Sequence, residues 1–293
     1  MGDEPRRATQ NGRRRGARIR LRLDGVKGSS VPQSFQYVLS ERERDTFTIW
    51  LNHPERLNVL SLTLMQELTQ AFIDVGESDA TGVILAAKGR LFSAGHDFAE
   101  MANQDLDAVR HLFGVCTTMM QTIQSIPQPV VARVHALATG GGCQLVATAD
   151  LAVAAEEATF CTPGGKGGLF CTTPLVAVGR SIGRKRALEM AMTGDPIDAG
   201  TAEAWGLINV VVPMNELDDA TTRLLRRATR GSATSKGIGK RAFYEQMAMS
   251  QTDAYVYATD VMAAASLLPD AQESIAAFIE KRPPKFTSST EAT

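Results

Sequence analysis

Hydrophobic and polar residues alternate along the first part of the chain as the strands and helices of an α/β protein require. Two apolar stretches, SFQYVLS (34–40) and TFTIWLN (46–52), flank the polar sequence ERERD and predict two strands joined by a turn. A helix is predicted between Ser61, a typical N-cap, and Gly76, because apolar residues recur there at helical spacing: Leu64, Leu68, Ala71, Phe72 and Val75.

Strands and helices continue to alternate up to about residue 155. Three apolar stretches predict buried strands, and they are TGVILAA (81–87), VVARVHA (130–136) and LAVAA (151–155). A helix over 104–125 separates the first two, and a short helix after a glycine triplet separates the last two. This alternation is typical of parallel βαβ units. We therefore expect an α/β fold with a mostly parallel sheet.

The second half of the chain is mostly helical. Helices are predicted over 184–194, 198–206 and 215–229, with one more strand at LINVVV (207–212) and three further helices from Lys236 onward. The pattern predicts three regions, which are a basic, disordered extension (1–33), an α/β core (34–215) and a helical C-terminal region (216–293).

Charge is distributed unevenly over the 293 residues. The net charge is −1, yet residues 1–27 carry eight Arg and one Lys against three acidic residues, a net +6 that leaves −7 for the remainder. The acidic body predicts no nucleic-acid surface. The basic head is interpreted either as a solvated tail or as an Arg-rich mitochondrial presequence. Since no run of about 18 uncharged apolar residues occurs, we expect no membrane span.

Two glycine-containing loops follow buried strands, and these are the candidates for chemistry. The loop SAGHD (93–97) follows one strand, and TGGGCQ (139–144) follows another and opens a helix. Ligands of parallel α/β sheets bind beyond the carboxyl ends of the strands. Two convergent backbone N–H groups form an oxyanion hole, and a helix N-terminus favours negative charge. Packing alone also explains glycine turns before helices, so spacing leaves both interpretations open.

The chain resembles the crotonase superfamily, the enoyl-CoA hydratase/isomerase group. Five stretches carry the resemblance over about 240 residues in the family's order, which are LNHPERLNVLSLTLMQEL, GRLFSAGHDFAEM, PQPVVARVHALATGGGCQLVATADLAVAAEEATF, ALEMAMTGDPIDAGTAEAWGLINVVVP and AAFIEKRPPKF. The variant TPGGKGGLFCTTP is similar to one branch of the family. The resemblance implies the crotonase (ClpP-like) fold of repeated ββα units, with a helical C-terminal region that forms a homotrimer or a dimer of trimers.

The resemblance also implies a ligand and roles for particular residues. An acyl-CoA thioester is the expected substrate or ligand, with no other cofactor and no metal. The backbone N–H groups of His96 and Gly141 would hold its thioester oxygen as an enolate forms, so the His96 imidazole is not needed as a base. Further substrate-binding residues are expected around the two loops: Arg56, Leu57, Ala94, Asp97, Phe98, Gly140 and Pro163. Asp97 and Asp150 match family aspartates that we interpret as structural.

Two departures from the family pattern bear on the reaction. Hydratases of this family carry glutamates at the positions of Gln144 and Gly164, where the carboxylates move the protons of water. An amide does not titrate and glycine offers only its backbone. A positioned acid or base contributes about 10²- to 10⁴-fold. Ordinary hydration of a 2-enoyl-CoA is therefore expected to be very slow.

Three functional hypotheses stay open. The first is an acyl-CoA enzyme whose chemistry needs only enolate stabilisation, such as decarboxylation; the second is a catalytically silent acyl-CoA-binding protein; the third is a hydratase with a substitute acid or base. Substitutes near the loops are Cys143, Cys161, Cys171, Lys166, Thr162 and Thr172. The cysteines have no CxxC spacing and the histidines His53, His111 and His135 have no metal-ligand spacing, so packing or surface roles are favoured. The expected location is the bacterial cytoplasm, with the mitochondrial matrix as the alternative.

Overall fold

A six-stranded sheet forms the centre of the molecule. In the computed structural model, which describes residues 35–287, the strands are ordered β1-β2-β3-β4-β6-β9. They are β1 (Val38–Glu43), β2 (Thr46–Leu51), β3 (Gly82–Ala87), β4 (Val130–Val134), β6 (Leu151–Ala155) and β9 (Val210–Val212). Only β1 and β2 are antiparallel, and every other neighbouring pair is parallel. The predicted mostly parallel sheet is confirmed, while the extension 1–33 lies outside the described residues.

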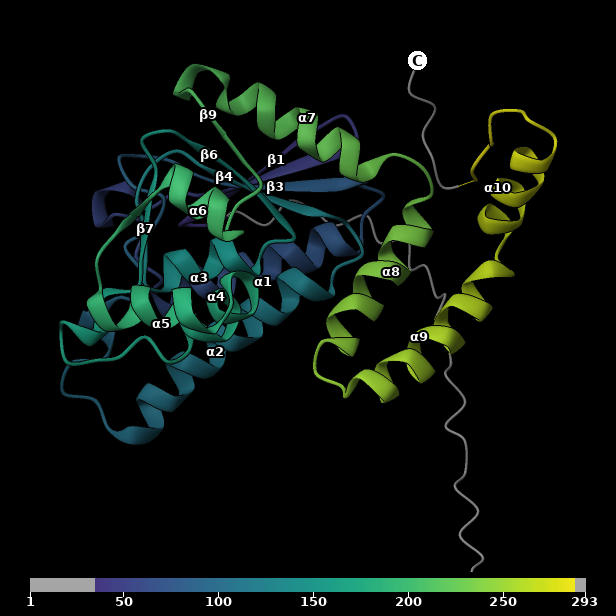
Figure 1. The fold of residues 1–293 in the computed structure, drawn as a ribbon. Helices are drawn as coiled ribbons and strands as arrows, with labels where there is room; N and C mark the ends of the chain where they lie inside the picture. The colour runs from purple at the N-terminus through teal and green to yellow at the C-terminus, as the bar shows by residue number, and fades with distance from the viewer. Residues whose placement is uncertain (1–34, 288–293) are drawn as a thin grey trace, which may run out of the picture.

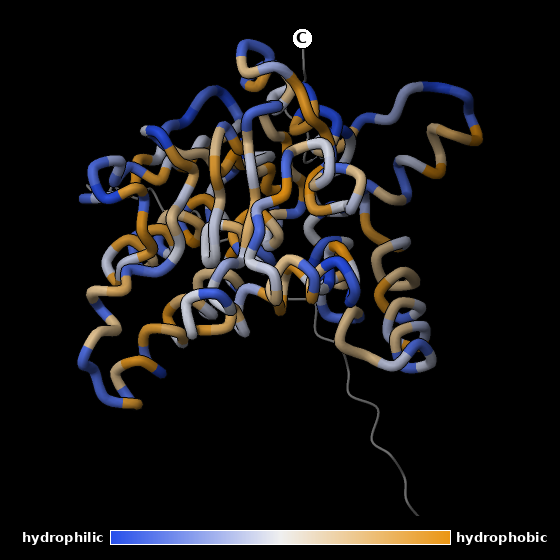
Figure 2. Tube along the Cα trace, turned by 60° about the vertical axis from the view of Figure 1, so that its left-hand side comes forward, coloured by the Kyte–Doolittle hydropathy of each residue, from blue (hydrophilic) through white to orange (hydrophobic). Residues whose placement is uncertain are grey.

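Alternate residues of the central strands face two separate layers of helices. Val83, Leu85, Val130 and Ala132 pack with α1 (Leu62–Gly76), α2 (Leu106–Ser125) and α3 (Gly141–Thr148), whereas Val131, Val153 and Ala155 pack with α7 (Leu217–Thr229). Period-two alternation in buried strands produces this division because successive side chains point to opposite faces. Figure 1 shows α7 on one side of the sheet and α1, α2 and α3 on the other. In Figure 2 hydrophobic stretches run through the centre of the molecule, and further ones lie on helices at its periphery.

The helix predicted after Ser61 forms as expected. The Ser61 hydroxyl accepts a hydrogen bond from the Leu64 N–H at 3.3 Å, which satisfies one free donor of the first turn. Asp105 caps α2 in the same way, through the Ala108 N–H at 2.8 Å. The turn between the first two strands is shorter than predicted, because β1 continues through Glu43 and pairs with β2 at Thr46.

A second, small sheet was not predicted. It has the order β5-β7-β8 and consists of β5 (Ala138–Thr139), β7 (Thr159–Cys161) and β8 (Ile197–Asp198). Strands of two or three residues are too short for alternation to show in a sequence. Two ββα repeats result, β4-β5-α3 and β6-β7-α4, where α4 spans Pro174–Ile182. These repeats agree with the crotonase fold.

The remaining helices follow the predicted order. They are α5 (Arg184–Thr193), α6 (Ala199–Trp205), α8 (Ala233–Gln246), α9 (Gln251–Ser266) and α10 (Pro269–Ile279), with short 3₁₀ turns η1 (Pro54–Arg56), η2 (Phe98–Glu100), η3 (Pro163–Gly165) and η4 (Met214–Glu216). In Figure 1, α8, α9 and α10 stand to one side of the sheet. The boundary predicted at residue 216 stays a prediction, and α7 beyond it packs on the sheet. Within residues 35–287, no helix is long and apolar enough to cross a membrane.

The projecting helices are anchored to the core by a buried ion pair. Lys240 of α8 lies 2.7 Å from Asp150 and donates to the carbonyls of Ile123 and Gln128 at 3.0 and 2.8 Å. Asp150 also accepts from the Tyr244 hydroxyl at 2.8 Å and from the Val130 N–H at 2.7 Å. Every strong donor and acceptor of this cluster is therefore paired, as burial of charge requires.

Candidate functional site

The two glycine loops meet backbone to backbone. Ser93 and Ala138 form an isolated parallel bridge, and the Thr139 N–H donates to the Ser93 carbonyl at 3.0 Å. Gly95 has a φ of +81°, and a Cβ there would lie 2.8 Å from the Thr139 carbonyl oxygen and 3.0 Å from the Gly141 nitrogen. Such a close approach requires glycine. The structure thus brings 93–97 and 139–142 together, as the sequence predicts.

Two backbone donors at this contact, the N–H groups of His96 and Gly141, have no acceptor within residues 35–287. The Leu60 N–H donates to the Gly95 carbonyl at 2.7 Å, and the Asp97 N–H donates to the Leu60 carbonyl at 3.5 Å. In a parallel bridge of this kind the intervening residue, His96, turns its own N–H away from Leu60. Gly141 is the first residue of α3, where N–H groups have no intrahelical acceptor and the helix dipole is positive.

The His96 side chain packs against the same glycine. A Cβ on Gly141 would lie 3.2 Å from the imidazole Nδ1 and 2.9 Å from a Leu60 methyl group. On its other side the ring meets Phe113 edge-on, with ring centroids 5.1 Å apart. Burial lowers the pKa of His96 to about 4 from an ordinary 6.5. The imidazole is therefore neutral at physiological pH, and its Nε2 has no partner among the described residues.

Gln144 follows Gly141 by one turn of α3 and is only 6% exposed. Its side-chain Oε1 has no hydrogen-bond partner within residues 35–287, and the same holds for the fully buried Thr162 hydroxyl. Unpaired buried acceptors are uncommon and costly, unless a water or a ligand completes them. The sequence indicates Thr162 only as one of six residues near the loops, and the structure shows that its hydroxyl is buried and, in the described part of the chain, unpaired.

Gly164 lies under a tight loop that leaves no room for a side chain. The N–H groups of Gly167 and Leu169 both donate to the Gly164 carbonyl, at 3.1 and 2.9 Å. A Cβ on Gly164 would lie 1.9 Å from the Leu169 carbonyl oxygen and 2.8 Å from the Cys171 Sγ. The path of the loop therefore excludes a carboxylate at this position. Replacing glycine alone would not restore one, because the backbone would also have to move.

Arg56 links two of the expected binding segments, η1 and the loop 93–97, through an ion pair. Its guanidinium pairs with Asp97 through contacts of 2.9 and 3.1 Å, and the side chain is still 52% exposed. Asp97 also accepts from the Ala99 N–H at 3.0 Å and so begins η2. Leu57, in the left-handed region at φ +57°, accepts from the Ala94 N–H at 3.0 Å.

The other expected binding residues border the same loops. Phe98 is 69% exposed on η2. Gly140 has a φ of +54° and donates its N–H to the Cys161 carbonyl at 2.9 Å. Pro163 is the first residue of η3. Gly140 thus belongs to the second glycine loop itself, Phe98 directly follows the first, and Pro163 follows β7, which pairs with β5.

The remaining candidates have ordinary structural partners. Lys166 pairs with Asp195 on the surface, His53 stacks on Tyr37 with ring centroids 3.9 Å apart, and His135 contacts the Gly89 carbonyl at 2.8 Å. All four cysteines are free thiols. Burial raises the pKa of each: Cys116 (to about 12), Cys143, Cys161 and Cys171. None is therefore prepared as a thiolate nucleophile. No cluster of three metal-ligating side chains occurs among the described residues.

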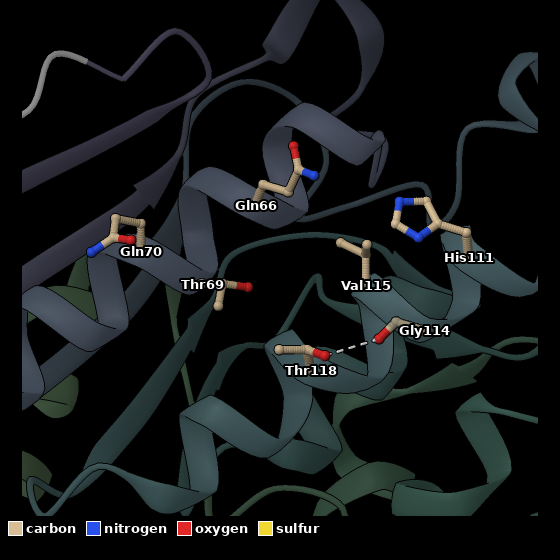
Figure 3. Close-up of a pocket in the computed structure, with 7 residues that line it drawn as sticks. All are labelled: Gln66, Thr69, Gln70, His111, Gly114, Val115 and Thr118. Atoms are coloured by element: carbon tan, nitrogen blue, oxygen red, sulfur yellow. Dashed lines mark hydrogen bonds between the residues drawn. The ribbon is translucent and has the colours of Figure 1, made fainter.

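A hollow of about 410 Å³ lies elsewhere, between α1 and α2 (Figure 3). Amides, hydroxyls and one imidazole line it: Gln66, Thr69, Gln70, His111, Gly114, Val115 and Thr118. The four lining residues of α2 recur at i, i+3, i+4 and i+7 and therefore share one face of that helix. Phe113, which touches His96, does not fit this spacing and lies on a different face. All seven lining residues, His111 among them, come from α1 and α2 and none from the glycine loops. The hollow is thus separate from those loops.

Comparison with known proteins identifies the family of this chain. Residues 41–289 match the family model described as Enoyl-CoA hydratase/isomerase. Enoyl-CoA hydratase domain-containing protein 3, mitochondrial, of Xenopus laevis is 40% identical over 90% of this chain and 90% of that protein.

Two solved structures have the same fold. A crystal structure of an enoyl-CoA hydratase of Mycobacterium smegmatis is 40% identical, with a TM-score of 0.82, and covers 85% of this chain and 98% of its own. The human enoyl Coenzyme A hydratase domain-containing protein 3 is 38% identical, also with a TM-score of 0.82, and covers 86% and 100%. These matches confirm both the resemblance and the predicted fold.

Proposed function

We propose that this chain, which belongs to the enoyl-CoA hydratase/isomerase family, binds an acyl-CoA thioester and stabilises its enolate without hydrating double bonds. The observation that carries the proposal is the contact between the two glycine loops, where the N–H groups of His96 and Gly141 have no acceptor within residues 35–287. Two such donors, one of them at a helix N-terminus, suit a thioester oxygen that becomes negatively charged.

Hydration needs a general base that takes a proton from water, and the residues of this site do not supply one. Adding water to a double bond requires a base to take a proton and an acid to return one. Gln144 does not titrate, Gly164 has no space for a side chain, and the His96 imidazole is neutral and carries a low pKa. We therefore expect the hydration of crotonyl-CoA to stay near background.

Decarboxylation of a malonyl-type CoA ester fits the same groups best. Loss of CO₂ leaves the electron pair of the broken C–C bond in the enolate, so no base is needed for that step. The enolate oxygen would receive both backbone N–H groups, and the carboxylate of the substrate supplies the leaving group. The CoA ester itself is the only organic partner that the proposal requires.

The test is to incubate the purified protein separately with malonyl-CoA, methylmalonyl-CoA and crotonyl-CoA and to follow turnover and binding. The proposal expects CO₂ release from a malonyl-type ester and no hydration of crotonyl-CoA. Binding of all three esters without turnover would instead indicate a silent acyl-CoA-binding protein. Rapid hydration of crotonyl-CoA would establish a hydratase with a substitute acid or base.

Self-association is proposed for the projecting helices. Apolar side chains of α9 and α10 and of the turn between them are exposed, with Met262 at 77%, Leu267 at 76% and Phe278 at 85%. Exposed apolar surface of this extent favours burial against another subunit. A homotrimer or a dimer of trimers, as the family implies, would cover it, and a monomer in light scattering at micromolar concentration would contradict this.

For location, the animal relatives support the mitochondrial matrix. The Xenopus laevis protein and the Rattus norvegicus one, 41% identical over 87% of this chain and 86% of that protein, are both named mitochondrial. The bacterial cytoplasm stays a prediction.

A further inference from the structure

The loop above Gly164 places a thiol beside the position that lacks a side chain. The Gly164 N–H donates to the Cys171 Sγ at 3.3 Å. That sulfur would lie 2.8 Å from a Cβ on Gly164. The Cys171 thiol therefore lies beside the place where a side chain of residue 164 would begin, which the Leu169 carbonyl oxygen itself occupies. It is an ionisable group next to a position that carries only glycine.

The same loop adjoins the start of α3. The strand register pairs Thr139 with Cys161, and the Cys161 thiol donates to the Thr139 hydroxyl at 3.1 Å. Cys143 lies in the first turn of α3, which begins two residues after Thr139. The strand pairing and the Gly164–Cys171 hydrogen bond therefore bring the segments of Cys161 and Cys171 next to the helix start that carries the Gly141 N–H.

Two buried side-chain oxygens that lack a partner within residues 35–287 lie on the same segments as the thiols. Gln144 Oε1 and Thr162 Oγ1 have no partner among the described residues, although the two side chains are 6% and 0% exposed. Gln144 adjoins Cys143 on α3, and Thr162 lies between Cys161 and η3. Buried acceptors of this kind are completed by a bound molecule or water.

Cys171 differs from its neighbours in ways that suit proton donation. It is only half-buried, whereas Cys143 and Cys161 are 0% and 7% exposed. Burial raises its pKa, so the thiol keeps its proton at neutral pH. The Gly164 N–H would stabilise the thiolate left behind, and access to solvent permits reprotonation. The neutral imidazole of His96 is a much weaker acid than a thiol.

We propose that the Cys171 thiol donates the proton that converts the enolate into product, an inference that rests on the proposed enolate chemistry. When the substrate's C–C bond breaks, CO₂ leaves and its electron pair enters the enolate. The Cys171 S–H bond then breaks, the proton forms a C–H bond at the α-carbon, and the electron pair of the S–H bond stays on sulfur. Water returns a proton to the thiolate, so atoms and charge balance without an oxidant.

The test separates CO₂ release from protonation of the α-carbon. Methylmalonyl-CoA is decarboxylated in D₂O by the wild type, Cys171→Ala and Cys171→Ser, and the configuration of the deuterated α-carbon of propionyl-CoA is determined. Cys161→Ser is the matched control, since it removes a neighbouring thiol and keeps a hydroxyl beside Thr139. The wild type and the control should give one configuration. Both Cys171 variants should still release CO₂, at a rate within about tenfold of the wild type, but give a nearly equal mixture.

Each contrary result has a distinct meaning. A single configuration retained in both Cys171 variants would overturn the role of Cys171 and leave the enolate chemistry intact. A mixture from the wild type would also overturn it, because solvent would then protonate the enolate. No CO₂ release from the folded wild type would remove the decarboxylation proposal together with this inference. Cys171→Ser nearly conserves side-chain volume and keeps the test decisive if Cys171→Ala does not fold.

Discussion

Two neighbouring regions of this molecule stand in contrast. The contact between 93–97 and 139–142 is made of backbone, with glycines at the points of closest approach. The loop 162–171 follows β7, and it holds the position at which the resemblance implies a carboxylate in hydratases of the family. Here that loop closes over Gly164 so tightly that a Cβ would lie 1.9 Å from the Leu169 carbonyl oxygen. In our proposal the first region supplies two oxyanion-hole donors, and the second lacks a carboxylate that could move protons.

Under the proposed function, the difference indicates which part of the site survives sequence change. Backbone donors are fixed by the fold, so many side chains can vary around them without altering their direction. Activation of water depends on particular side-chain carboxylates, and it is lost when those change. A chain can therefore keep the capacity to stabilise an enolate while losing the capacity to hydrate.

The largest effect is expected from removing one backbone donor. Gly141→Pro takes away the N–H at the first position of α3, where proline is compatible with a helix. We expect enolate chemistry to slow by about 10²- to 10³-fold, or about 2.7–4 kcal/mol in the transition state. The rate of CO₂ release from a malonyl-type ester measures it.

Two controls isolate the N–H from other effects of that substitution. Gly141→Ala introduces the same Cβ near Leu60 and His96 but keeps the N–H, so it should retain most of the activity. His96→Ala removes the imidazole and keeps its backbone donor, so it should also be largely active. If His96→Ala, still folded, proved as damaging as Gly141→Pro, the imidazole would be a participant.

Restoring a carboxylate in the second region, the loop 162–171, should not restore hydration. Gly164→Glu adds a Cβ that meets the Leu169 carbonyl oxygen, so we expect a loss of stability of at least about 1–3 kcal/mol and no gain in hydration. Denaturant unfolding measures the first and crotonyl-CoA turnover the second. Gly167→Ala is the matched control, since its nearest atom would be at 3.8 Å. A stable and hydrating Gly164→Glu variant would show that this loop is not the obstacle.

A smaller effect concerns pH and the His96 side chain. The pKa of His96 is about 4 in the folded protein and 6.5 ordinarily, so between these values the unfolded chain binds a proton that the folded chain does not. The stabilising contribution is complete above pH 6.5 and falls as the pH falls toward 4. Between pH 7 and pH 5 the wild type should lose about 1–2 kcal/mol more than His96→Gln. Equal losses in denaturant unfolding would show that His96 is not held neutral.

The smallest effect is expected at Arg56. Its guanidinium pairs with Asp97 but is 52% exposed, and exposed ion pairs contribute at most about 1 kcal/mol. Arg56→Ala should therefore change the free energy of unfolding only slightly. If Arg56 also contacts the CoA moiety, the Kd for CoA esters rises in that variant, while the turnover rate of the bound substrate stays unchanged. Titration calorimetry with CoA distinguishes the two roles.

Long periodic segments were predictable from the sequence, and short ones were not. The helix from Leu62 and the strands around Val83 and Val131 follow from spacing, since each buries a continuous face. The strands β5, β7 and β8 escaped prediction because two or three residues carry no periodicity. The first hairpin turn was placed too early, because polar residues of an exposed edge strand look like a turn.

The candidate site was predictable only in part for a similar reason. Glycine patterns and the family resemblance pointed to His96, Gly141, Gln144 and Gly164, whose surroundings the structure then supplies. The close contact between Gly164 and Leu169 could not be predicted, since it depends on the path of the loop in three dimensions. The same is true of the hydrogen bond that brings Cys171 to Gly164.

Ionisation of bound acetoacetyl-CoA tests the central claim most directly. An oxyanion hole favours the enolate of this ester, so its ultraviolet enolate absorbance should grow when the wild-type protein or His96→Ala is added. The increase should be lost with Gly141→Pro and kept with Gly141→Ala. If the ester binds to the wild type and its enolate absorbance does not change, the N–H groups of His96 and Gly141 do not stabilise an enolate, and the proposed function is wrong.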